Sequence, residues 1–427
     1  MTDTNPAHGN GAPNDTPAPA PVAAVNLIKA DTLGQYFSNW IARVRAGDTG
    51  ALPVIGGLII LAVIFQSLNG NFLTPGNLVN LMVQGSVYML FSLGMIFILL
   101  LGEIDLSIGF IGGVAGVVTA LMVYGDHGFP WWLAVPAGLL CGAAIGLLNG
   151  IIITGIGLPA FIVTLAGLLA WNGVMLIILG NGGTIPINNE MITNLANGLL
   201  DPTVSWIVMA VLLALICTDM IVTSRRRKHS SEPAGLIWLK IAGIIVAGIL
   251  VVALCNVNRG RAAPIQGVPW VLLIVFGFAW LWTIVQKRTR FGTYVYAIGG
   301  NAEAARRAGI PVKRIRIAVF TIAGFMGGVA GIIYASRLRS VSTNLDGGTL
   351  VLYCIAAAVI GGTSLFGGRG RAISAILGGL VIASIDNGMG LLGLAAAMRY
   401  VVTGIVLIIA VTIDALASRG RASSGLS

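Results

Sequence analysis

The chain has 427 residues, of which 56% are hydrophobic and 9% are charged. Soluble domains carry about 25% charged residues, so this composition excludes a water-soluble globular protein. The formal net charge of +10 does not indicate nucleic-acid binding, because the basic residues stand in short clusters between apolar runs. Such clusters are typical of the loops that orient membrane helices.

The N-terminal residues differ in composition from the rest of the chain. Residues 1–30 are rich in Pro, Ala, Asn and Asp, and we expect a disordered cytoplasmic tail there. Residues 31–47 place apolar side chains at helical spacing beside Arg43 and Arg45. This pattern predicts an amphipathic helix lying on the cytoplasmic membrane surface. An ordinary packed helix fits the same pattern.

Residues 48–418 form the expected transmembrane domain, in which apolar runs of about 20 residues recur. Helices are expected, because lipid cannot satisfy exposed backbone groups. The fold class is therefore an all-α polytopic membrane protein with about twelve transmembrane helices. The predicted spans are 51–68, 78–101, 106–124, 131–154, 158–180, 203–223, 236–255, 269–286, 316–335, 349–364, 372–393 and 401–417.

Basic residues favour one orientation of these spans. If the N-terminus is cytoplasmic, the loops after even-numbered spans are cytoplasmic too. Those loops hold Arg225–Lys228, the long loop 287–316, and the pair Arg369 and Arg371. An excess of Lys and Arg marks the cytoplasmic side, so both termini, including the tail 419–427, are expected there.

The pentapeptide Gly-Gly-Val-Ala-Gly occurs twice, at 112–116 and at 327–331. Transporters often contain internal repeats, so the two copies are compatible with related halves of the chain. Small residues also let two membrane helices approach closely, which is the simpler interpretation.

The loop 287–316 contains a short segment with the features of an isolated helix. Asn301 is placed to cap its start and Glu303 lies in the first turn. Two arginines occupy the last turn, and Gly309 with Pro311 ends the helix. A short alanine-rich helix between two spans suits docking into a partner's groove. A plain amphipathic surface helix is the alternative.

Three segments resemble the ribose/xylose-type permeases of ABC importers. They are Gly102–Gly109, Arg290–Ile310 and Val359–Gly370, which occur in the order of that family. The similarity extends over roughly residues 50–415. It implies a multi-pass protein of the bacterial cytoplasmic (inner) membrane, which imports sugar as a permease homodimer with cytoplasmic ABC ATPase subunits and an extracytoplasmic sugar-binding protein.

The resemblance also implies site residues. The family helix that contacts the ATPase matches 300–309, which supplies Gly300, Asn301, Glu303, Ala304, Ala305, Arg306 and Gly309. The spans 203–223 and 236–255 look like a hairpin added to a ten-helix family core. That longer form resembles the xylose-type branch and implies xylose or a related monosaccharide as the substrate.

The chain lacks the residues of an ATPase or of another enzyme. A phosphate-binding loop needs a Gly-Lys pair followed by Ser or Thr, and none of the five lysines follows a glycine. The four cysteines show no metal-ligand or disulfide spacing. We therefore expect no catalytic residue, metal or cofactor in this chain, with ATP and Mg bound by the partner ATPase.

Polar residues within the predicted spans are functional candidates, because they are costly in a membrane. A neutral sugar needs amide, hydroxyl and aromatic partners, so six residues are candidates for the translocation pathway. Such side chains also tie helices together, which is the alternative role. The six are Asn149, Trp171, Asn172, Thr363, Ser364 and Asn387.

Glu103 and Asp105 lie in a very short turn between two predicted spans. We expect a structural role, in which the carboxylates stabilise the next helix start. They could instead neutralise a nearby arginine or line the pathway.

Two further functions remain open at this point. The same architecture could import another small polar solute, such as a branched-chain amino acid. An ion-coupled secondary transporter would use intramembrane acids such as Asp219 and Asp386, although a stand-alone carrier has no use for a docking helix.

Overall fold

The computed structural model describes residues 52–406, apart from 126–127, 227–233, 261–262, 344 and 396, together with a few residues outside that range. The predicted tails 1–30 and 419–427 lie outside the described residues. So does the predicted helix 31–47, apart from Gly34, Gln35 and Ser38, and so do 407, 410–411 and 413–417 of the last predicted span.

Helices make up most of the described chain. They are α2 (Leu52–Leu68), α3 (Pro75–Leu100), α4 (Ile108–Met122), α5 (Trp131–Ile156), α6 (Ala160–Leu179), α7 (Glu190–Asn197), α8 (Pro202–Arg226), α9 (Ala234–Asn256), α10 (Trp270–Arg288), α11 (Arg290–Gly300), α12 (Ala302–Arg307), α13 (Val312–Leu338), α14 (Gly347–Ile360) and α15 (Ala372–Leu391). A shorter apolar helix, Ala397–Val406, follows α15.

The first eleven predicted spans each coincide with one of these helices, with limits that agree within a few residues. Eight helices of the described chain are long and apolar enough to cross a membrane. Four shorter apolar helices, among them α2, α4 and α14, accompany them. The expectation of a helical, polytopic membrane protein is confirmed.

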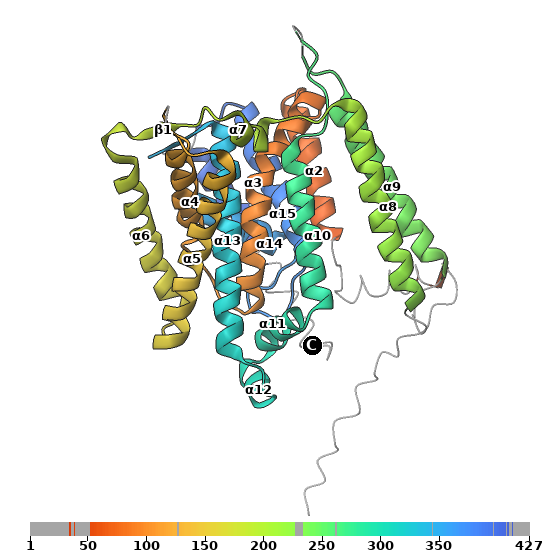
Figure 1. Ribbon diagram of the computed structural model, residues 1–427. Coiled ribbons are helices and arrows are strands. Elements are labelled where there is room, and N and C mark those ends of the chain that lie inside the picture. Colours follow the sequence, from red (N-terminus) through yellow and green to blue (C-terminus); the bar gives the residue numbers. More distant parts are fainter. Residues whose placement is uncertain are drawn as a thin grey trace, which may run out of the picture.

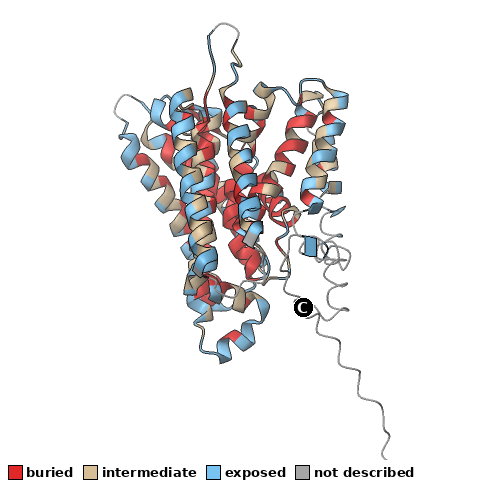
Figure 2. Cartoon of the chain, turned by 90° about the vertical axis from the view of Figure 1, so that its right-hand side faces the viewer, coloured by how far each residue is buried: buried red, intermediate tan, exposed pale blue. Residues whose placement is uncertain are grey.

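Helix α3 lies at the centre of the bundle, and 89% of its apolar window is buried inside the protein. Helices α13, α14 and α15 pack around it (Figure 1). In contrast, α6 lies at the edge, where 28% of its window is buried. Figure 2 shows the same gradient, with buried residues inside and exposed residues on the outer helices. The exposed side chains of α5, α6, α8 and α9 include many large apolar ones, as a lipid-facing surface requires.

The two Gly-Gly-Val-Ala-Gly segments lie against each other, one on α4 and one on α13. A Cβ atom at Gly331 would lie 2.0 Å from the carbonyl oxygen of Gly112. A Cβ atom at Gly112 would likewise lie 2.7 Å from the carbonyl oxygen of Gly327. Only glycine permits backbones to approach this closely, so the interpretation as a helix contact is confirmed.

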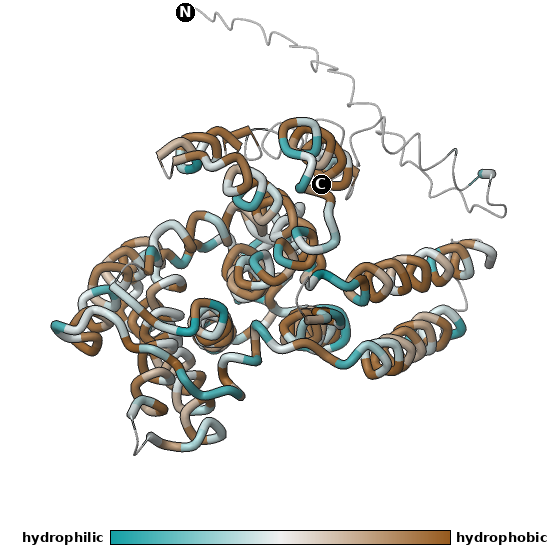
Figure 3. Tube along the Cα trace, turned by 90° about the horizontal axis from the view of Figure 1, so that it is seen from above, coloured by the Kyte–Doolittle hydropathy of each residue, from teal (hydrophilic) through white to brown (hydrophobic). Residues whose placement is uncertain are grey.

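Helices α8 and α9, the predicted additional hairpin, stand beside the bundle next to α10 (Figure 1). Seen from above, the hairpin projects from the rest and is mainly hydrophobic (Figure 3). Asp219 on α8 binds Arg288 at the end of α10 with Oδ1 and Oδ2 at 2.6 and 2.8 Å. A small apolar cluster with Val252, Cys255 and Leu272 joins it to the core near the other end.

The end of the bundle opposite α12 carries a helix and a strand pair that were not predicted from the sequence. Helix α7 lies there, and strand β1 (Thr184–Pro186) pairs antiparallel with β2 (Ser340–Ser342). Ser336 near the end of α13 accepts a hydrogen bond from Asn197 through its carbonyl oxygen at 2.8 Å. Helix α7 and the strand pair therefore lie across one end of the bundle (Figure 1).

Candidate functional site

Helices α11 and α12 project from one end of the bundle (Figure 1). The side chain of Thr289 accepts from the amide of Gly292 at 3.1 Å and so caps α11. Asn301 ends α11 and caps α12, because its Oδ1 accepts from the amide of Ala304 at 2.9 Å. The predicted cap is confirmed. Gly299 and Gly300, expected in the same short helix, belong instead to the preceding helix α11.

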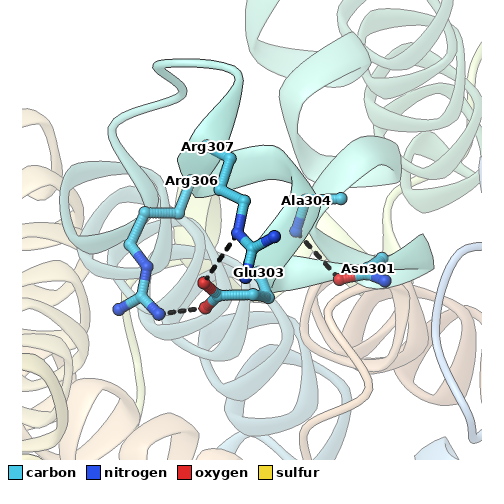
Figure 4. A network of polar contacts seen from close by, with 5 residues as sticks. All are labelled: Asn301, Glu303, Ala304, Arg306 and Arg307. Atoms are coloured by element: carbon cyan, nitrogen blue, oxygen red, sulfur yellow. Dashed lines mark hydrogen bonds and ion pairs between the residues drawn. The ribbon is translucent and has the colours of Figure 1, made fainter.

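The outer surface of α12 is charged and open to solvent. Glu303 forms ion pairs with Arg306 and, at 3.3 Å, with Arg307 (Figure 4). The side chains of Arg306 and Arg307 are 70% and 80% exposed. The hydrogen bond from Arg306 holds the pKa of the Glu303 carboxyl below its usual value. Only Ala305 is buried, and Gly309 ends the turn with φ +81°. The helix therefore presents a charged, solvent-exposed surface whose ion pairs form within α12 itself.

Under α12, glycines bring three segments into backbone contact. A Cβ atom at Gly299 would lie 1.7 Å from the carbonyl oxygen of Leu100, the last residue of the central helix α3. The amide of Gly368 donates to that same oxygen at 2.9 Å. A Cβ atom at Gly367 would lie 2.7 Å from the carbonyl oxygen of Gly299. We call this contact of Leu100, Gly299 and Gly368 the glycine junction.

Side chains reinforce the glycine junction. Tyr296 on α11 donates its hydroxyl to the carbonyl oxygen of Gly370 at 2.6 Å. The amide of Ala372 donates to Oε1 of Gln286 at 2.9 Å. Gly102 also lies against Phe366 and Gly367. The three segments that resemble the permease family, although far apart in the chain, therefore meet at the base of α12. Nothing in their local sequence indicated this contact.

Glu103 and Asp105 have different environments. Glu103 binds Arg316 of α13 at 2.6 Å, and their side chains are 16% and 26% exposed. Asp105 is fully buried, and its Oδ1 accepts from both the amide and the hydroxyl of Ser107, at 2.8 and 2.6 Å. Both carboxylates hold the break between α3 and α4 in place.

The six candidate pathway residues do not come together. Asn149 is buried and donates to the hydroxyl of Ser107 at 3.0 Å. Asn387 exchanges hydrogen bonds with Asn77 at 2.8 and 3.0 Å. Trp171 and Asn172 lie on the peripheral α6, while Thr363 and Ser364 lie in the turn after α14 near the α12 end. The hydrogen bonds of Asn149 and Asn387 therefore join one helix to another.

Two cavities of the described chain involve other residues. One, of about 930 Å³, lies between α12, the end of α5 and the start of α13, and contains Glu303, Arg306 and Arg316. The second, of about 180 Å³, is lined by side chains from α3, α13, α14 and α15 and includes Asp386. None of the six candidate pathway residues lines either cavity.

Within the described ranges no group of three or more His, Cys, Asp or Glu is placed to hold a metal ion.

Three residues that line the second cavity with Asp386 were not predicted from the sequence: Tyr88, Tyr353 and Arg399. The sequence carries only a weak signal for a site at these residues. Tyr88 and Tyr353 are single tyrosines in apolar helices, where a tyrosine is usually a packing residue. Arg399 stands between two predicted spans, 372–393 and 401–417.

A family model described as the permease component of branched-chain amino acid transport systems matches residues 77–411. The xylose transport system permease protein of Escherichia coli (strain K12) is 34% identical, over 90% of this chain and 96% of the relative. The corresponding protein of Haemophilus influenzae is also 34% identical, over 85% of this chain and 95% of the relative.

A ribose import permease protein of Escherichia coli (strain K12) is 32% identical, over 84% of this chain and 91% of the relative. No solved structure matches the chain. The relatives are named as transport permeases, and the matches extend over nearly their whole length.

Proposed function

Because this chain belongs to the family described as the permease component of branched-chain amino acid transport systems, we propose that it is the permease subunit of a bacterial ATP-driven sugar importer. The relatives that match most of its length are named for xylose and ribose, not for amino acids. Xylose or a closely related monosaccharide is therefore the proposed substrate. A stand-alone ion-coupled carrier is disfavoured, because the acids it would use, Asp219 and Asp386, already have Arg288 and Arg399 beside them.

The exposed, capped helix α12 is the observation that carries the proposal. A charged helix of six residues that buries one side chain, Ala305, has little to stabilise it alone. It is suited to a groove on another protein. We propose that Gly300, Asn301, Glu303, Ala304, Ala305, Arg306 and Gly309 form the surface or the local fold that an ATPase subunit contacts. That ATPase subunit would bind ATP and Mg, since this chain has no phosphate-binding loop.

The distribution of basic residues supports placing α12 in the cytoplasm. Near the α12 end of the bundle stand Arg225, Arg226, Lys287, Arg288, Arg290, Arg306, Arg307, Lys313, Arg314, Arg316, Arg369 and Arg371. The other end has Arg259, Arg337, Arg339 and Arg399. This bias favours twelve spans with both termini in the cytoplasm of a bacterium, in its inner membrane.

The proposed mechanism uses the glycine junction as the mechanical link. Closure of two ATPase domains would push on α12 of each copy in a permease homodimer. Since Gly299 and Gly368 contact the end of α3 through backbone atoms, the push would reach the central helix without a flexible side chain between. An extracytoplasmic sugar-binding protein would deliver the sugar to the opposite end, where α7 and the strand pair lie.

Co-purification from the native membrane tests the proposal. The wild-type protein should recover an ATPase subunit, and Glu303→Arg should recover far less, because the reversal breaks both ion pairs and places a third cation on α12. Glu190→Arg is the matched control, since Glu190 is an exposed acid in the first turn of α7 at the other end. Recovery of no ATPase with the wild type, or equal recovery with both variants, would contradict the docking role of α12.

A further inference from the structure

The second cavity is built from residues far apart in the chain. Its floor is formed by Tyr88 at the middle of α3, Tyr353 on α14 and Asp386 on α15. Both tyrosines are 7% exposed, and their rings meet edge to face with centroids 5.3 Å apart. The floor is therefore a rigid aromatic corner beside a carboxylate, at about half the height of the central helix.

Asp386 is only partly satisfied by the protein. Its Oδ2 accepts from the Tyr88 hydroxyl at 2.7 Å and from the Gln84 amide. Its Oδ1 faces Arg399 at 3.8 Å, which is longer than a hydrogen bond. The Arg399 Nε donates to the carbonyl oxygen of Leu394 at 3.1 Å. One carboxylate oxygen and part of one guanidinium thus face the cavity.

The mouth of the cavity lies at the end opposite α12. Asp346, the cap of α14, accepts from the Tyr400 hydroxyl at 3.2 Å and from the Thr349 amide at 3.0 Å. Asp346 and Tyr400 are exposed, whereas Tyr88 and Tyr353 are buried. The cavity therefore deepens from the solvent-facing end toward the central helix. Its volume of about 180 Å³ holds about six waters at ~30 Å³ each, which is the scale of a monosaccharide.

We propose that this cavity, with Asp386, Arg399 and Tyr353 as its main contacts, binds a monosaccharide on its way through the permease. The inference deepens the proposed sugar import and rests on it. Neighbouring sugar hydroxyls donate to Oδ1 of Asp386 and accept from Arg399, and the C–H face of the ring lies on Tyr353. Charged donors and acceptors make the stronger hydrogen bonds.

The lining disfavours the other solutes of related importers. A branched-chain amino acid needs a deep apolar surface for its side chain, and the lining residues offer Leu350 as the aliphatic one. A bare cation would meet the Arg399 guanidinium next to the only deep carboxylate of this cavity. A neutral polyhydroxyl ligand satisfies the acid and the base together.

Substrate protection of an introduced cysteine tests the site in the full chain within membranes. Thr349→Cys places a thiol on the cavity wall, and Thr343→Cys places one at the same end outside the cavity. A membrane-impermeant maleimide is added from the outer face with or without D-xylose, and the wild type reports labelling of its own cysteines. D-xylose should slow labelling at position 349 and leave position 343 unchanged.

Two charge-removing variants in the Thr349→Cys background extend the test. Asp386→Asn and Arg399→Gln should each raise the D-xylose concentration needed for protection about tenfold, the loss of one hydrogen bond to a charged group. Arg337→Gln, at the same end but outside the cavity, should leave it unchanged. Equal responses from Asp386→Asn and Arg337→Gln would overturn the assignment. Where Asp386→Asn does not fold, Arg399→Gln makes the same comparison.

Uptake of D-xylose by the same membranes separates this inference from the proposed function. Uptake without protection of position 349 would overturn the cavity assignment alone. Protection by leucine instead of D-xylose, with no D-xylose uptake, would overturn both.

Discussion

Gly299 of α11 lies against the carbonyl oxygen of Leu100, so closely that a Cβ atom at Gly299 would be 1.7 Å from that oxygen. The amide of Gly368 donates a hydrogen bond to the same carbonyl oxygen at 2.9 Å. The end of the central helix is therefore held by two segments distant in sequence, both through backbone atoms. Because α11 continues directly into the exposed α12, a force on α12 has a short and stiff route to α3.

Gly299→Ala should weaken this contact. A methyl group cannot fit beside Leu100 and Gly368 without moving backbone, and overpacking of this kind costs about 1–3 kcal/mol. Gly300→Ala is the neighbouring control, because a Cβ atom there meets nothing within 4 Å. Thermal unfolding in detergent, followed by tryptophan fluorescence, should show a lower midpoint for Gly299→Ala only. Equal midpoints for the two variants would contradict the close approach.

Glu103→Gln should be costly, because it leaves the Arg316 guanidinium without its charged partner. Arg316 is only 26% exposed, and breaking a buried ion pair costs about 3–5 kcal/mol. Partial exposure puts the expected loss near the lower value. The double variant Glu103→Gln/Arg316→Gln should recover part of that loss. Strictly additive losses in this double-mutant cycle would argue that the two side chains do not interact.

Asp219→Asn should have little effect by comparison. The Asp219–Arg288 pair has good geometry, but its side chains are 41% and 48% exposed, and exposed pairs contribute about 0–1 kcal/mol. The variant should unfold near the wild-type temperature and retain sugar uptake. A complete loss of uptake with unchanged stability would instead revive Asp219 as an ion-coupling residue.

Asn301→Ala should loosen α12 while Asn301→Asp should not. The side-chain oxygen of Asn301 accepts from the amide of Ala304, and losing such a cap costs about 1 kcal/mol. Aspartate supplies the same acceptor. Hydrogen exchange of the peptide covering 300–310 should therefore accelerate in the alanine variant alone, and equal rates in both variants would show that the cap does not stabilise this helix.

The positions of the helices could be predicted from the sequence, because long apolar runs report directly on burial in lipid. Asn301 and Gly309 likewise marked the ends of α12 by local rules. Contacts across the bundle could not be predicted. Hydropathy gives the depth of a residue in the membrane but not the helix beside it, so the meeting of Leu100, Gly299 and Gly368 had no local signal.

The candidate pathway residues illustrate the same limit. A polar group in an apolar helix predicts a pathway role for Asn149, yet it donates to Ser107 and joins α5 to the break before α4. Asp386 came to notice only as an acid. Its role in a cavity depends on Tyr88 and Arg399, which three-dimensional packing brings to it. The residue type indicates only that an acid such as Asp386 is costly to bury. Its neighbours in the fold indicate what it can bind.

Uptake by the reconstituted complex tests the central claim most directly. The permease, purified with its ATPase subunit and placed in proteoliposomes with the sugar-binding protein, should accumulate radiolabelled D-xylose when ATP is supplied at the α12 face. Glu303→Arg should abolish this uptake, and Glu190→Arg should leave it intact. Uptake that proceeds without ATP, or that Glu303→Arg leaves unchanged, would contradict an ATP-driven importer coupled through α12.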